Sequence, residues 1–362
     1  MSGFVKLGDL THIRTGKLDA NASSENGQYP FFTCSKEPLR IASYSYDCEC
    51  VLVAGNGDLN VKYYDGKFDA YQRTYIIESA DKRKLLVKYL YFFLDIYVEV
   101  LRTQSIGGVI KYIKLSNLTD ALIPLPSIKR QAEIIECLEK CNTLIDTRQR
   151  EIALIEQTVK SRFIELFGDY DLTHPQESWV TIKEIGTVVG GATPKTDHDE
   201  YWGGSHRWIT PAELDADSGY IYDSVRKLTK AGVESCSLQE MPVGTVFLSS
   251  RAPIGKMAIA GNTFYCNQGF KNIICKEDIT PRYLYTVLLL NVEYLNSLGR
   301  GATFKEISKG IVENIRIPVP AMELQKQFAA FVEQTDKSKL AVQKGLQELE
   351  ILKKSLMQQY FG

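Results

Sequence analysis

Glycine-containing turns that also carry basic and amide side chains are the strongest chemical signal in this chain of 362 residues. Glycine lets a backbone approach a ligand closely because it has no side chain. Arginine, glutamine and asparagine can form paired hydrogen bonds with base edges, whereas lysine, serine and threonine suit phosphate oxygens. In the second half of the chain, such turns occupy residues 190–196, 249–256, 266–272 and 299–306. This combination predicts contact with a nucleic acid.

Turns of the same character recur in the first half, at residues 14–17, 55–64, 70–74 and 104–114. For any single residue in them, an ordinary solvated turn is the simpler interpretation. Their recurrence at comparable places in both halves favours binding. The candidate DNA-contacting residues of the second half are Thr193, Lys195, Arg251, Lys256, Gln268, Lys271, Arg300, Thr303 and Lys305. Those of the first half are Asn56, Asn60, Gln72, Arg73, Lys111 and Tyr112.

No set of residues typical of an active site accompanies these turns. Segments 105–111 and 252–257 contain glycine and lysine, but they lack the spacing and the closing Ser or Thr of a phosphate-binding loop. The chain also lacks an Asn/Asp-Pro-Pro-aromatic run, which would resemble the base-binding motif of amino-methyltransferases. The tract Asp-His-Asp-Glu at 197–200 offers metal-ligand types, but its Gly/Thr/Pro-rich surroundings favour a solvated turn. We therefore predict neither catalytic residues nor a metal site.

Composition and charge limit the classes of partner. The chain is 44% hydrophobic and 24% charged, so it can bury substantial cores. Its 43 basic and 44 acidic residues exclude a histone-like polycation but leave room for local basic patches. Residues 1–122 hold 15 basic and 14 acidic side chains, and residues 169–316 hold 15 and 18. Because affinity for DNA grows with the number of phosphates neutralised, we expect this chain alone to bind DNA weakly.

Cysteine spacing and apolar run lengths predict a cytoplasmic protein with no membrane association. The eight cysteines form no Cys-x-x-Cys pair, and Cys48 and Cys50 are too close for ordinary zinc-knuckle spacing. No stretch reaches the ~18 apolar residues of a membrane span, and residues 2–20 do not resemble a signal peptide. We expect free thiols in a reducing compartment.

The chain contains an internal repeat. Residues 123–168 and 317–362 are each 46 residues long and align without a gap. Identical pairs in this alignment include Pro124 with Pro318, Gln131 with Gln325, Glu139 with Glu333, Phe167 with Phe361 and Gly168 with Gly362. The alignment continues upstream at the same offset, where residues 105–118 pair with 299–312. Weaker similarity relates residues 4–10 to 179–185, and places Gln72 opposite Gln268. Two similar halves with different middles indicate two related tasks on two different targets.

Each repeated tail predicts one long helix that follows a Pro-x-Pro pair and stops at Gly168 or Gly362. Gly345 should weaken the second helix without ending it. A seven-residue apolar pattern, typical of coiled coils, runs along both copies. In the first copy this stripe contains Ile134, Leu138, Cys141, Ile145, Arg148, Ile152, Ile155, Val159, Arg162 and Leu166. In the second copy it contains Phe328, Val332, Thr335, Lys339, Val342, Leu346, Leu349, Lys353, Leu356 and Tyr360. Neither helix can bury its stripe alone, so we expect the two to pack on each other; the alternative is that each lies on its own domain.

The regions between the tails predict α+β globules, because short β-rich runs are followed by helical stretches at 86–102 and 281–298. We predict two globular α/β domains in a duplicated pseudo-two-fold arrangement. Two long helices, forming an antiparallel coiled coil, would separate them. The expected boundaries are 1–122 and 169–316 for the domains, and 123–168 and 317–362 for the helices.

Over essentially its whole length, the sequence resembles the specificity subunit of a type I restriction-modification system. The resemblance rests on the two similar halves and on the two helices that begin with Ile-Pro-x-Pro. It also rests on the opening at 179–185 and on the motifs SSRAPIGK, NQGFK and GATFKEI of the second half. The first half departs from the family pattern S-x-R-x-P-x-G at residues 55–64.

The resemblance implies that each domain reads one half of a split site in double-stranded DNA. It also implies that the helices bind two modification subunits, which carry S-adenosylmethionine and methylate adenine. A restriction subunit with translocase activity would supply cleavage that depends on ATP and Mg. No cofactor and no catalysis would belong to this chain. One alternative is a single-chain nuclease or methyltransferase with an unrecognised site, which predicts turnover by the isolated chain. A second alternative is a purely structural coiled-coil adaptor, which leaves the duplicated loops unexplained.

Overall fold

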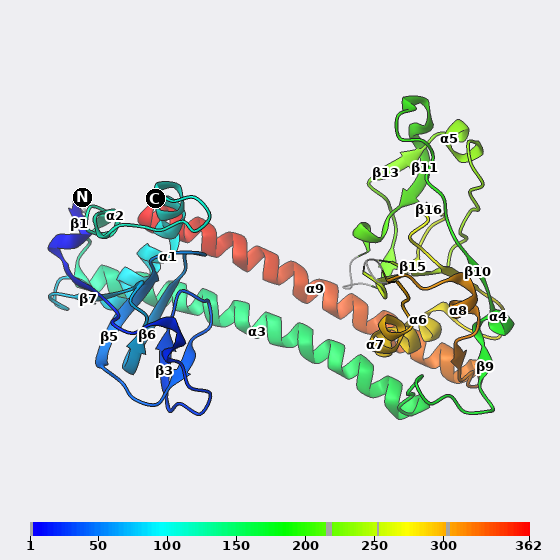
Figure 1. The fold of residues 1–362 in the computed structure, drawn as a ribbon, viewed down its shortest axis with the longest axis horizontal. Helices are drawn as coiled ribbons and strands as arrows, with labels where there is room; N and C mark the ends of the chain where they lie inside the picture. Colours follow the sequence, from blue (N-terminus) through cyan, green and yellow to red (C-terminus); the bar gives the residue numbers. More distant parts are fainter. Residues whose placement is uncertain (1–2, 215–218, 252, 302–304) are drawn as a thin grey trace. The chain divides into compact units, whose positions relative to one another are not determined.

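The computed structural model describes residues 3–214, 219–251, 253–301 and 305–362 (Figure 1). The chain divides into two compact units, Met1–Glu151 with Val342–Gly362, and Ile152–Ala341. The long helices α3 (Ile128–Phe167) and α9 (Met322–Phe361) each contribute one segment to the first unit and one to the second.

The first unit is built on a mixed sheet with the strand order β2-β7-β5-β6-β3-β4. Its strands are β2 (Thr11–Thr15), β3 (Tyr29–Phe32), β4 (Leu39–Ile41), β5 (Tyr46–Ala54), β6 (Val61–Ala70) and β7 (Thr74–Ser79). The smaller elements are β1 (Phe4–Lys6), η1 (Leu7–Asp9), η2 (Ala20–Ala22), α2 (Leu115–Thr119) and β8 (Leu122–Pro124). Helix α1 (Val87–Gln104) packs on β5 and β6. Alternate residues of β5 enter different cores, Val51 and Val53 on the α1 side and Cys50 and Leu52 on the other, because strand side chains alternate between faces.

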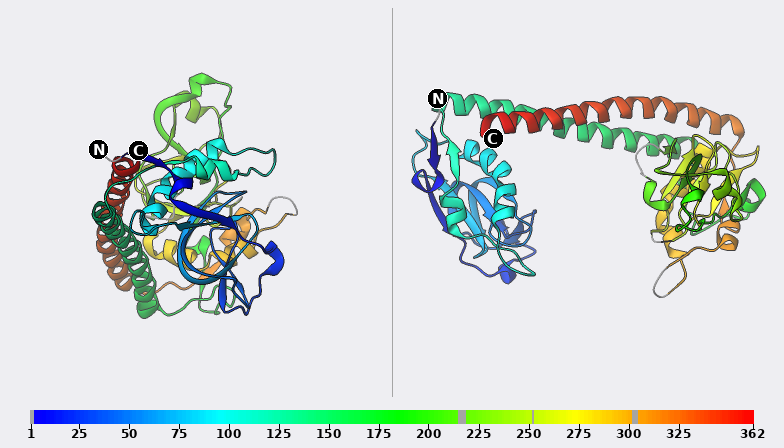
Figure 2. Two further views of the ribbon diagram at one scale, coloured as in Figure 1. Left: turned by 90° about the vertical axis from the view of Figure 1, so that its left-hand side faces the viewer. Right: turned by 90° about the horizontal axis from the view of Figure 1, so that it is seen from above.

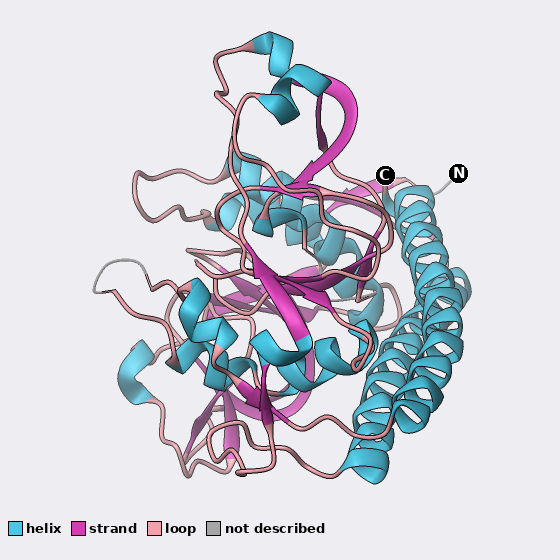
Figure 3. Ribbon diagram, turned by 90° about the vertical axis from the view of Figure 1, so that its right-hand side faces the viewer, coloured by secondary structure: helices cyan, strands magenta, loops and turns pink. Residues whose placement is uncertain are grey.

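The second unit has a related sheet with the order β10-β17-β14-β15-β12, and a smaller sheet with the order β13-β11-β16. Its strands are β9 (Val180–Thr181), β10 (Gly186–Val189), β11 (Trp202–Ile209), β12 (Tyr220–Ile221), β13 (Arg226–Leu228), β14 (Val246–Leu248), β15 (Met257–Ala260), β16 (Tyr265–Cys266), β17 (Asn272–Cys275) and β18 (Arg316–Ile317). Its short helices are α4 (Ile182–Ile185), η3 (Asp199–Tyr201), η4 (Pro211–Glu213), α5 (Lys230–Glu234), α6 (Pro281–Leu290), α7 (Val292–Ser297) and α8 (Lys309–Glu313). Strands β11 and β13, which Figure 1 labels, form with η3 and α5 an arm that extends beyond the sheet and lies at the top of Figure 3.

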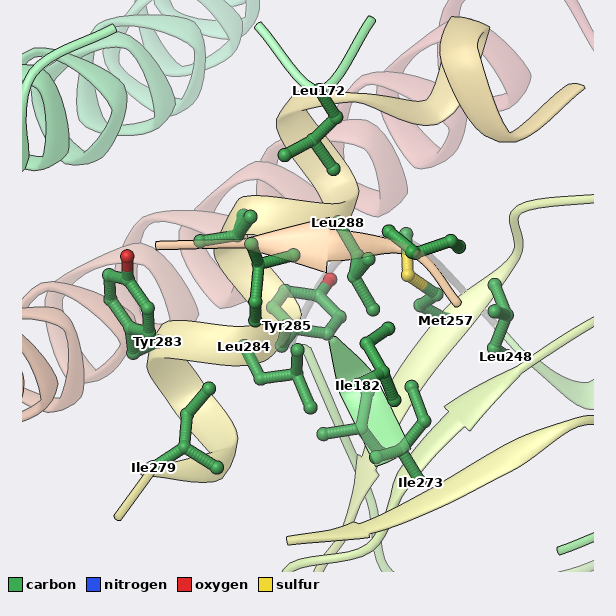
Figure 4. Close-up of a cluster of buried hydrophobic side chains, with 14 of the residues drawn as sticks. Leu172, Ile182, Leu248, Met257, Ile273, Ile279, Tyr283, Leu284, Tyr285 and Leu288 are labelled. Carbon is green, nitrogen blue, oxygen red and sulfur yellow. The ribbon is translucent and has the colours of Figure 1, made fainter. Parts of the chain in front are cut away.

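The core of the second unit lies between its sheet and α6 (Figure 4). Leu248 and Met257 from the sheet contact a cluster that includes Tyr283, Leu284 and Leu288 from α6. On the other side of β14 and β15, a second cluster contains Phe247, Ala258, Phe264 and Phe270. Both units therefore place a sheet with two apolar faces beside one helix that follows its last strand.

A buried glutamine fastens the start of α3 to the first unit. Gln131 has no exposed surface, and its amide Nε2 donates to the carbonyls of Lys84 at 2.8 Å and Pro126 at 3.0 Å. The backbone N–H of Leu86 donates to its Oε1 at 2.9 Å. One side chain thus bonds to two backbone groups of the segment before α1 and to one just before α3, and so ties the two helix starts together.

Gln325 makes the same three bonds in the second unit. Its Nε2 donates to the carbonyls of Asp278 at 3.1 Å and Pro320 at 2.9 Å, and its Oε1 accepts from the N–H of Thr280 at 2.8 Å. A tyrosine contact is repeated as well: the hydroxyl of Tyr89 donates to the carbonyl of Pro124, and that of Tyr283 to the carbonyl of Pro318. Burial raises the pKa of both phenols, so they stay protonated donors. The repeat read from the sequence is therefore a repeat of contacts.

Within each unit the α3 and α9 segments pack in antiparallel fashion. In the first unit, the last turn of α9 lies beside the start of α3 in both views of Figure 2. At this place the hydroxyl of Tyr360 lies 3.9 Å from the thiol sulfur of Cys137. In the second unit, Lys339 forms an ion pair with Glu156 at 2.8 Å, and the rings of Phe163 and Phe328 meet edge to face. Every residue of both predicted stripes is buried or half-buried, which confirms the predicted pairing of the helices.

The predicted helix over 281–298 is wrong in one respect, because the structure has two helices, α6 and α7, which meet at Asn291. The side chain of Asn291 is buried, and its Nδ2 donates to the carbonyls of Val287 and Tyr170. Its Oδ1 accepts from the N–H of Leu172 at 3.1 Å. Asparagine competes well for backbone partners, so it breaks the helix while fixing the segment that follows α3.

The predicted helix stop at Gly168 is confirmed. Gly168 has a φ of +91° directly after the last residue of α3, and its N–H donates to the carbonyl of Ile164. Glycine adopts this left-handed conformation without steric cost. Gly345, in contrast, lies inside α9 and does not interrupt it, as the sequence predicts.

We predict that Gln131→Leu lowers the free energy of unfolding of the first unit by about 2–3 kcal/mol, because buried backbone groups lose their partners. Urea denaturation combined with amide hydrogen exchange in α1 measures this loss. Gln149→Leu, at an exposed position of α3, is the matched control and should change stability by less than about 0.5 kcal/mol. Equal losses in the two variants would contradict the fastening role of Gln131.

Candidate nucleic-acid interface

Strand order explains why the predicted turns of each unit gather at one sheet edge. In the first unit, β2 and β5 both pair antiparallel with β7, so their carboxyl ends meet the start of β7. In the second unit, β10 and β14 have the same relation to β17. The loops at these ends form the first loop cluster, residues 14–17, 55–60, 70–74 and 104–114, and the second loop cluster, residues 190–196, 249–251, 253–256, 266–272, 299–301 and 305–306.

Backbone hydrogen bonds join the loops of the first loop cluster. The N–H of Gly55 donates to the carbonyl of Arg73 at 2.8 Å, and the carbonyl of Gly55 accepts from the N–H of Ile113 at 3.0 Å. Asn56 pairs with Tyr112 in an isolated β-bridge, and Tyr112 also exchanges two backbone bonds with Ile106. Three segments distant in sequence are thus fixed side by side.

The second loop cluster has the same bonds between other residues. The N–H of Ser250 donates to the carbonyl of Gly269 at 2.8 Å, and the carbonyl of Ser250 accepts from Ile307 at 2.9 Å. Arg251 forms the β-bridge to Glu306, which in turn exchanges two backbone bonds with Arg300. The backbone frame is therefore common to both clusters.

This common frame confirms two equivalences that the sequence alignment contains and adds one that it missed. Asn56 stands where Arg251 stands, although the motif around Arg251 has no counterpart in residues 55–64. Tyr112 similarly corresponds to Glu306, and Ile106 to Arg300. The sequence alignment of 105–118 with 299–312 already pairs Tyr112 with Glu306 and Ile106 with Arg300. The match of Asn56 with Arg251 follows only from the hydrogen bonds.

The loops after β2 and β10 are set by closely packed glycines. A Cβ on Gly16 would lie 2.1 Å from the carbonyl oxygen of Ala70, and one on Gly191 would lie 2.1 Å from that of Cys266. Real Cβ atoms do not approach so closely, so both positions need glycine. The neighbouring N–H of Ala192 donates to the same Cys266 carbonyl at 3.0 Å. Burial raises the pKa of the Cys266 thiol to about 12, which keeps this thiol uncharged beneath the loops.

The structure brings most of the predicted residues into the two loop clusters, with different exposure. The exposed ones are Thr193, Lys195, Gln268, Arg300, Lys305, Gln72, Arg73, Lys111 and Tyr112. The half-buried ones are Asn56, Asn60, Arg251, Lys256 and Lys271. Thr303 lies outside the described residues. The exposed lysines and arginines give each cluster a local basic character within a domain whose net charge is close to zero.

Two of the predicted residues are engaged inside the protein. The ammonium of Lys271, whose side chain is 15% exposed, pairs with Glu306 at 3.1 Å and donates to the hydroxyl of Ser250 at 3.3 Å. The amide of Asn60 donates to the carbonyls of Cys34 and Asp58. These bonds hold the loops in place, so the side chains of Lys271 and Asn60 help to position neighbouring residues.

The second loop cluster contains a side-chain hydrogen bond between two of its loops and borders a recess. The hydroxyl of Thr193 donates to Oε1 of Gln268 at 2.6 Å, which joins two of the loops. Beside Arg251 lies a hollow of about 560 Å³. Its lining consists of Thr210, Pro211, Ala212, Arg251, Asn267, Gly269 and Glu306. Donors and acceptors facing an open recess suit the hydrogen-bonding edge of a base.

The arm of the second unit was not expected from the sequence. The guanidinium of Arg226 lies 3.5 Å from the ring centre of Trp202 and 5.5 Å from that of Trp208. The indole N–H of Trp202 donates to the carbonyl of Lys195, so the predicted contact residue Lys195 lies at the arm. The two tryptophans can be seen in the sequence, but their ring contact at 5.1 Å depends on the irregularity of β11 between Trp202 and His206, which both lie opposite Leu228 of β13. The alternation of a regular strand does not predict this contact, because residues six apart in such a strand are about 20 Å apart.

The described part of the chain contains no group of three or more His, Cys, Asp and Glu side chains that could hold a metal ion. In the tract at 197–200, His198 contacts Glu200 at 2.8 Å through Nδ1. All eight cysteines are free thiols. Within the described ranges, none of the helices combines the length and apolar character that a membrane crossing requires.

The chain contains two duplicated α+β domains that are joined to long paired helices. Each domain has a basic loop cluster at one edge of its sheet. These features define a class of protein with two similar recognition domains. A sequence model described as the type I restriction modification DNA specificity domain matches residues 2–157 and 177–351. The chain belongs to this family and carries two copies of the domain.

Relatives and solved structures agree with this assignment. The chain is 41% identical over 184 residues to the specificity subunit of type I restriction enzyme MjaIX from Methanocaldococcus jannaschii, covering 49% of this chain and 42% of that protein. It is 40% identical over 158 residues to the EcoDI specificity subunit from Escherichia coli, covering 43% and 34%. In these two alignments the chain spans less than half the length of either relative.

The fold is similar to the crystal structure of the S subunit of a type I restriction-modification system from M. genitalium. The TM-score is 0.65 with 16% identity, over 99% of this chain and 96% of that one. A second structure, from work on complex assembly and conformational transition of the type I system, gives a TM-score of 0.56 with 16% identity over 99% and 98%. These similarities establish the architecture.

We predict that Gly191→Ala lowers the stability of the second unit by about 1–3 kcal/mol, because the added methyl group overlaps the Cys266 carbonyl. Thermal unfolding and hydrogen exchange at Ala192 measure the effect. The neighbouring Gly190→Ala is the control, since its Cβ would meet nothing closer than the Phe270 carbonyl at 3.8 Å. Similar behaviour of the two variants would show that the close approach at Gly191 does not matter.

Proposed function

We propose that this chain is the DNA-recognition subunit of a type I restriction-modification complex, in which each loop cluster reads one half of a split site in double-stranded DNA. The observation that carries the proposal is the identical backbone frame of the two clusters with different side chains on it. Asn56 replaces Arg251, and Tyr112 replaces Glu306. Two related domains that recognise different DNA sequences need a constant backbone frame and different side chains on it.

The side chains at the equivalent positions suit different bases. Arginine pairs with the O6 and N7 atoms of guanine, and asparagine pairs with the N6 and N7 atoms of adenine. Arg251 and Asn56 are both half-buried, so their loops restrict the directions that the side chains can take. Exposed basic residues such as Arg300, Lys305 and Lys111 would contact phosphates and fix the register on the duplex. The recognition domains on this proposal are residues 1–122 and 169–316.

The helices, residues 123–168 and 317–362, would bind two modification subunits and leave room for a restriction subunit with translocase activity. Support comes from large apolar side chains of α3 and α9 that lie off the paired stripes and are exposed. They are Leu144, Leu154, Ile164, Leu324, Leu340, Ile351 and Leu352. S-adenosylmethionine, ATP and Mg would be bound by those partners, and the complex would work in the cytoplasm.

We predict that Arg251→Ala changes the bases read in one half-site only, and that Asn56→Ala changes the other. Loss of one paired base contact costs about 1–3 kcal/mol, or roughly 5- to 150-fold in preference at that position. Mapping of methylated adenines in cells that carry each variant measures the change. Lys183→Ala, an exposed cation before the opposite end of β10, is the control and should leave the motif intact. Equal changes in both half-sites would contradict modular reading.

We predict that the purified chain transfers no methyl group to DNA and cleaves none, because chemistry on the bases would belong to the partner subunits. The measurement is incubation of the homogeneous chain with plasmid DNA, labelled S-adenosylmethionine, ATP and Mg²⁺. The same reaction with the purified complex is the control. Turnover by the chain alone would favour the alternative of an enzyme with an unrecognised site.

A further inference from the structure

A short loop in the first loop cluster exposes apolar side chains to an unusual degree. Val109 is 104% exposed, the highest value among the large apolar residues that the structure describes, and Ile110 is 63% exposed. Ile106, Tyr112 and Leu115 are also exposed, at 42%, 39% and 47%. Single exposed apolar residues are ordinary on protein surfaces, but five within ten residues are typical of a site that binds another molecule.

The tip of this loop stands on a fixed stem. Ile106 and Tyr112 exchange two backbone hydrogen bonds at 3.0 and 2.9 Å, which close the loop at its base. Gly107 has a φ of +119°, and a Cβ there would lie 2.5 Å from the carbonyl oxygen of Ile110. The stem is bridged to Asn56, so the tip and the residue equivalent to Arg251 belong to one cluster. A ligand bound at the first loop cluster therefore lies next to Val109 and Ile110.

The charges around the patch favour DNA as its occupant. Residues 103–119 include Lys111 and Lys114 and contain no aspartate or glutamate, whereas the nearby Arg102 is paired with Glu99 and Asp58. Lys111 and Lys114 are exposed on either side of Tyr112. Cations that flank an apolar tip fit a duplex, because phosphates line the groove walls and the bases offer apolar surface at the groove floor. Proteins use such tips against thymine methyl groups or between base steps.

We propose that Val109 and Ile110 enter a groove of the half-site read by the first unit and make apolar contact with its bases. This inference rests on the proposed function and adds to it a recognition element without hydrogen bonds. The tip would discriminate among bases by methyl groups and by the ease of opening a base step, whereas Asn56 discriminates by hydrogen bonding. The neighbouring Lys111 would hold the adjacent phosphates.

The test compares the complex purified from cells with a form that carries Val109→Ser together with Ile110→Ser. We expect about tenfold weaker binding to a duplex that carries the motif established by methylation mapping, with relaxed preference in the first half-site. Assembly with the modification subunits, measured without DNA, should be unchanged. Val243→Ser is the control, because Val243 is 64% exposed but precedes the opposite end of β14.

Two modified duplexes identify the contact. With 2-aminopurine at successive positions of the first half-site, insertion raises the fluorescence at one step for the unmodified complex and not for the double variant. With deoxyuridine in place of thymidine, a methyl contact weakens binding of the unmodified complex and leaves the variant unaffected. Unchanged affinity and motif in the double variant would overturn the inference, as would loss of assembly without DNA, which would assign the patch to a protein partner. If the unmodified complex itself showed no bipartite motif, the proposed function would fail instead.

Discussion

Neither globular domain completes its own hydrophobic core, and the rest of the structure depends on this constraint. In the first unit, Met357 and Phe361 at the end of α9 belong to the same core as α1, and the Phe361 ring lies 5.0 Å from that of Tyr89. In the second unit, Phe163 and Phe167 at the end of α3 belong to the core around α6. Each core thus takes its last side chains from the helix that begins in the other repeat. Burial of such aromatic rings is worth several kcal/mol, so each helix must extend from its own domain to the other core.

The paired helices carry polar residues within their apolar stripes. Lys339 is almost fully buried and is paired with Glu156, and Arg148 is half-buried near its salt-bridge partner Glu151 on the same helix. Loss of an ion-pair partner by a buried charge is costly, so a slip of one helix along the other would separate Lys339 from Glu156 at a cost in stability. Polar residues in a stripe of this kind typically fix register, at some expense of stability. The register in turn decides which helix residues reach each core.

The two loop clusters share a backbone frame and differ in the side chains on it. Gly16 and Gly191 press against equivalent carbonyls, and Gln131 and Gln325 make the same three bonds. Residues that differ, such as Asn56 against Arg251, take part in equivalent backbone bridges of the frame. On the proposed function, this construction would allow the DNA sequence that is read to change while the backbone contacts stay the same. The arm around Trp202 and Arg226 shows that larger additions are also accommodated in one unit.

The amino-acid sequence by itself determined the repeat, the two long helices, their paired stripes, the stop at Gly168 and the turns that form the loop clusters. These features are local, or they repeat at a constant spacing, so periodicity and alignment report them directly. Only the tertiary structure decided that Asn56 matches Arg251, that Asn291 divides the predicted helix, and that Lys271 and Asn60 are used to hold loops. The spacing between equivalent residues changes from 175 residues, between Gly16 and Gly191, to 196 residues, between Arg73 and Gly269. Insertions between strands cause these changes, and the equivalence is restored by hydrogen bonds between segments far apart in the chain, which no local pattern encodes.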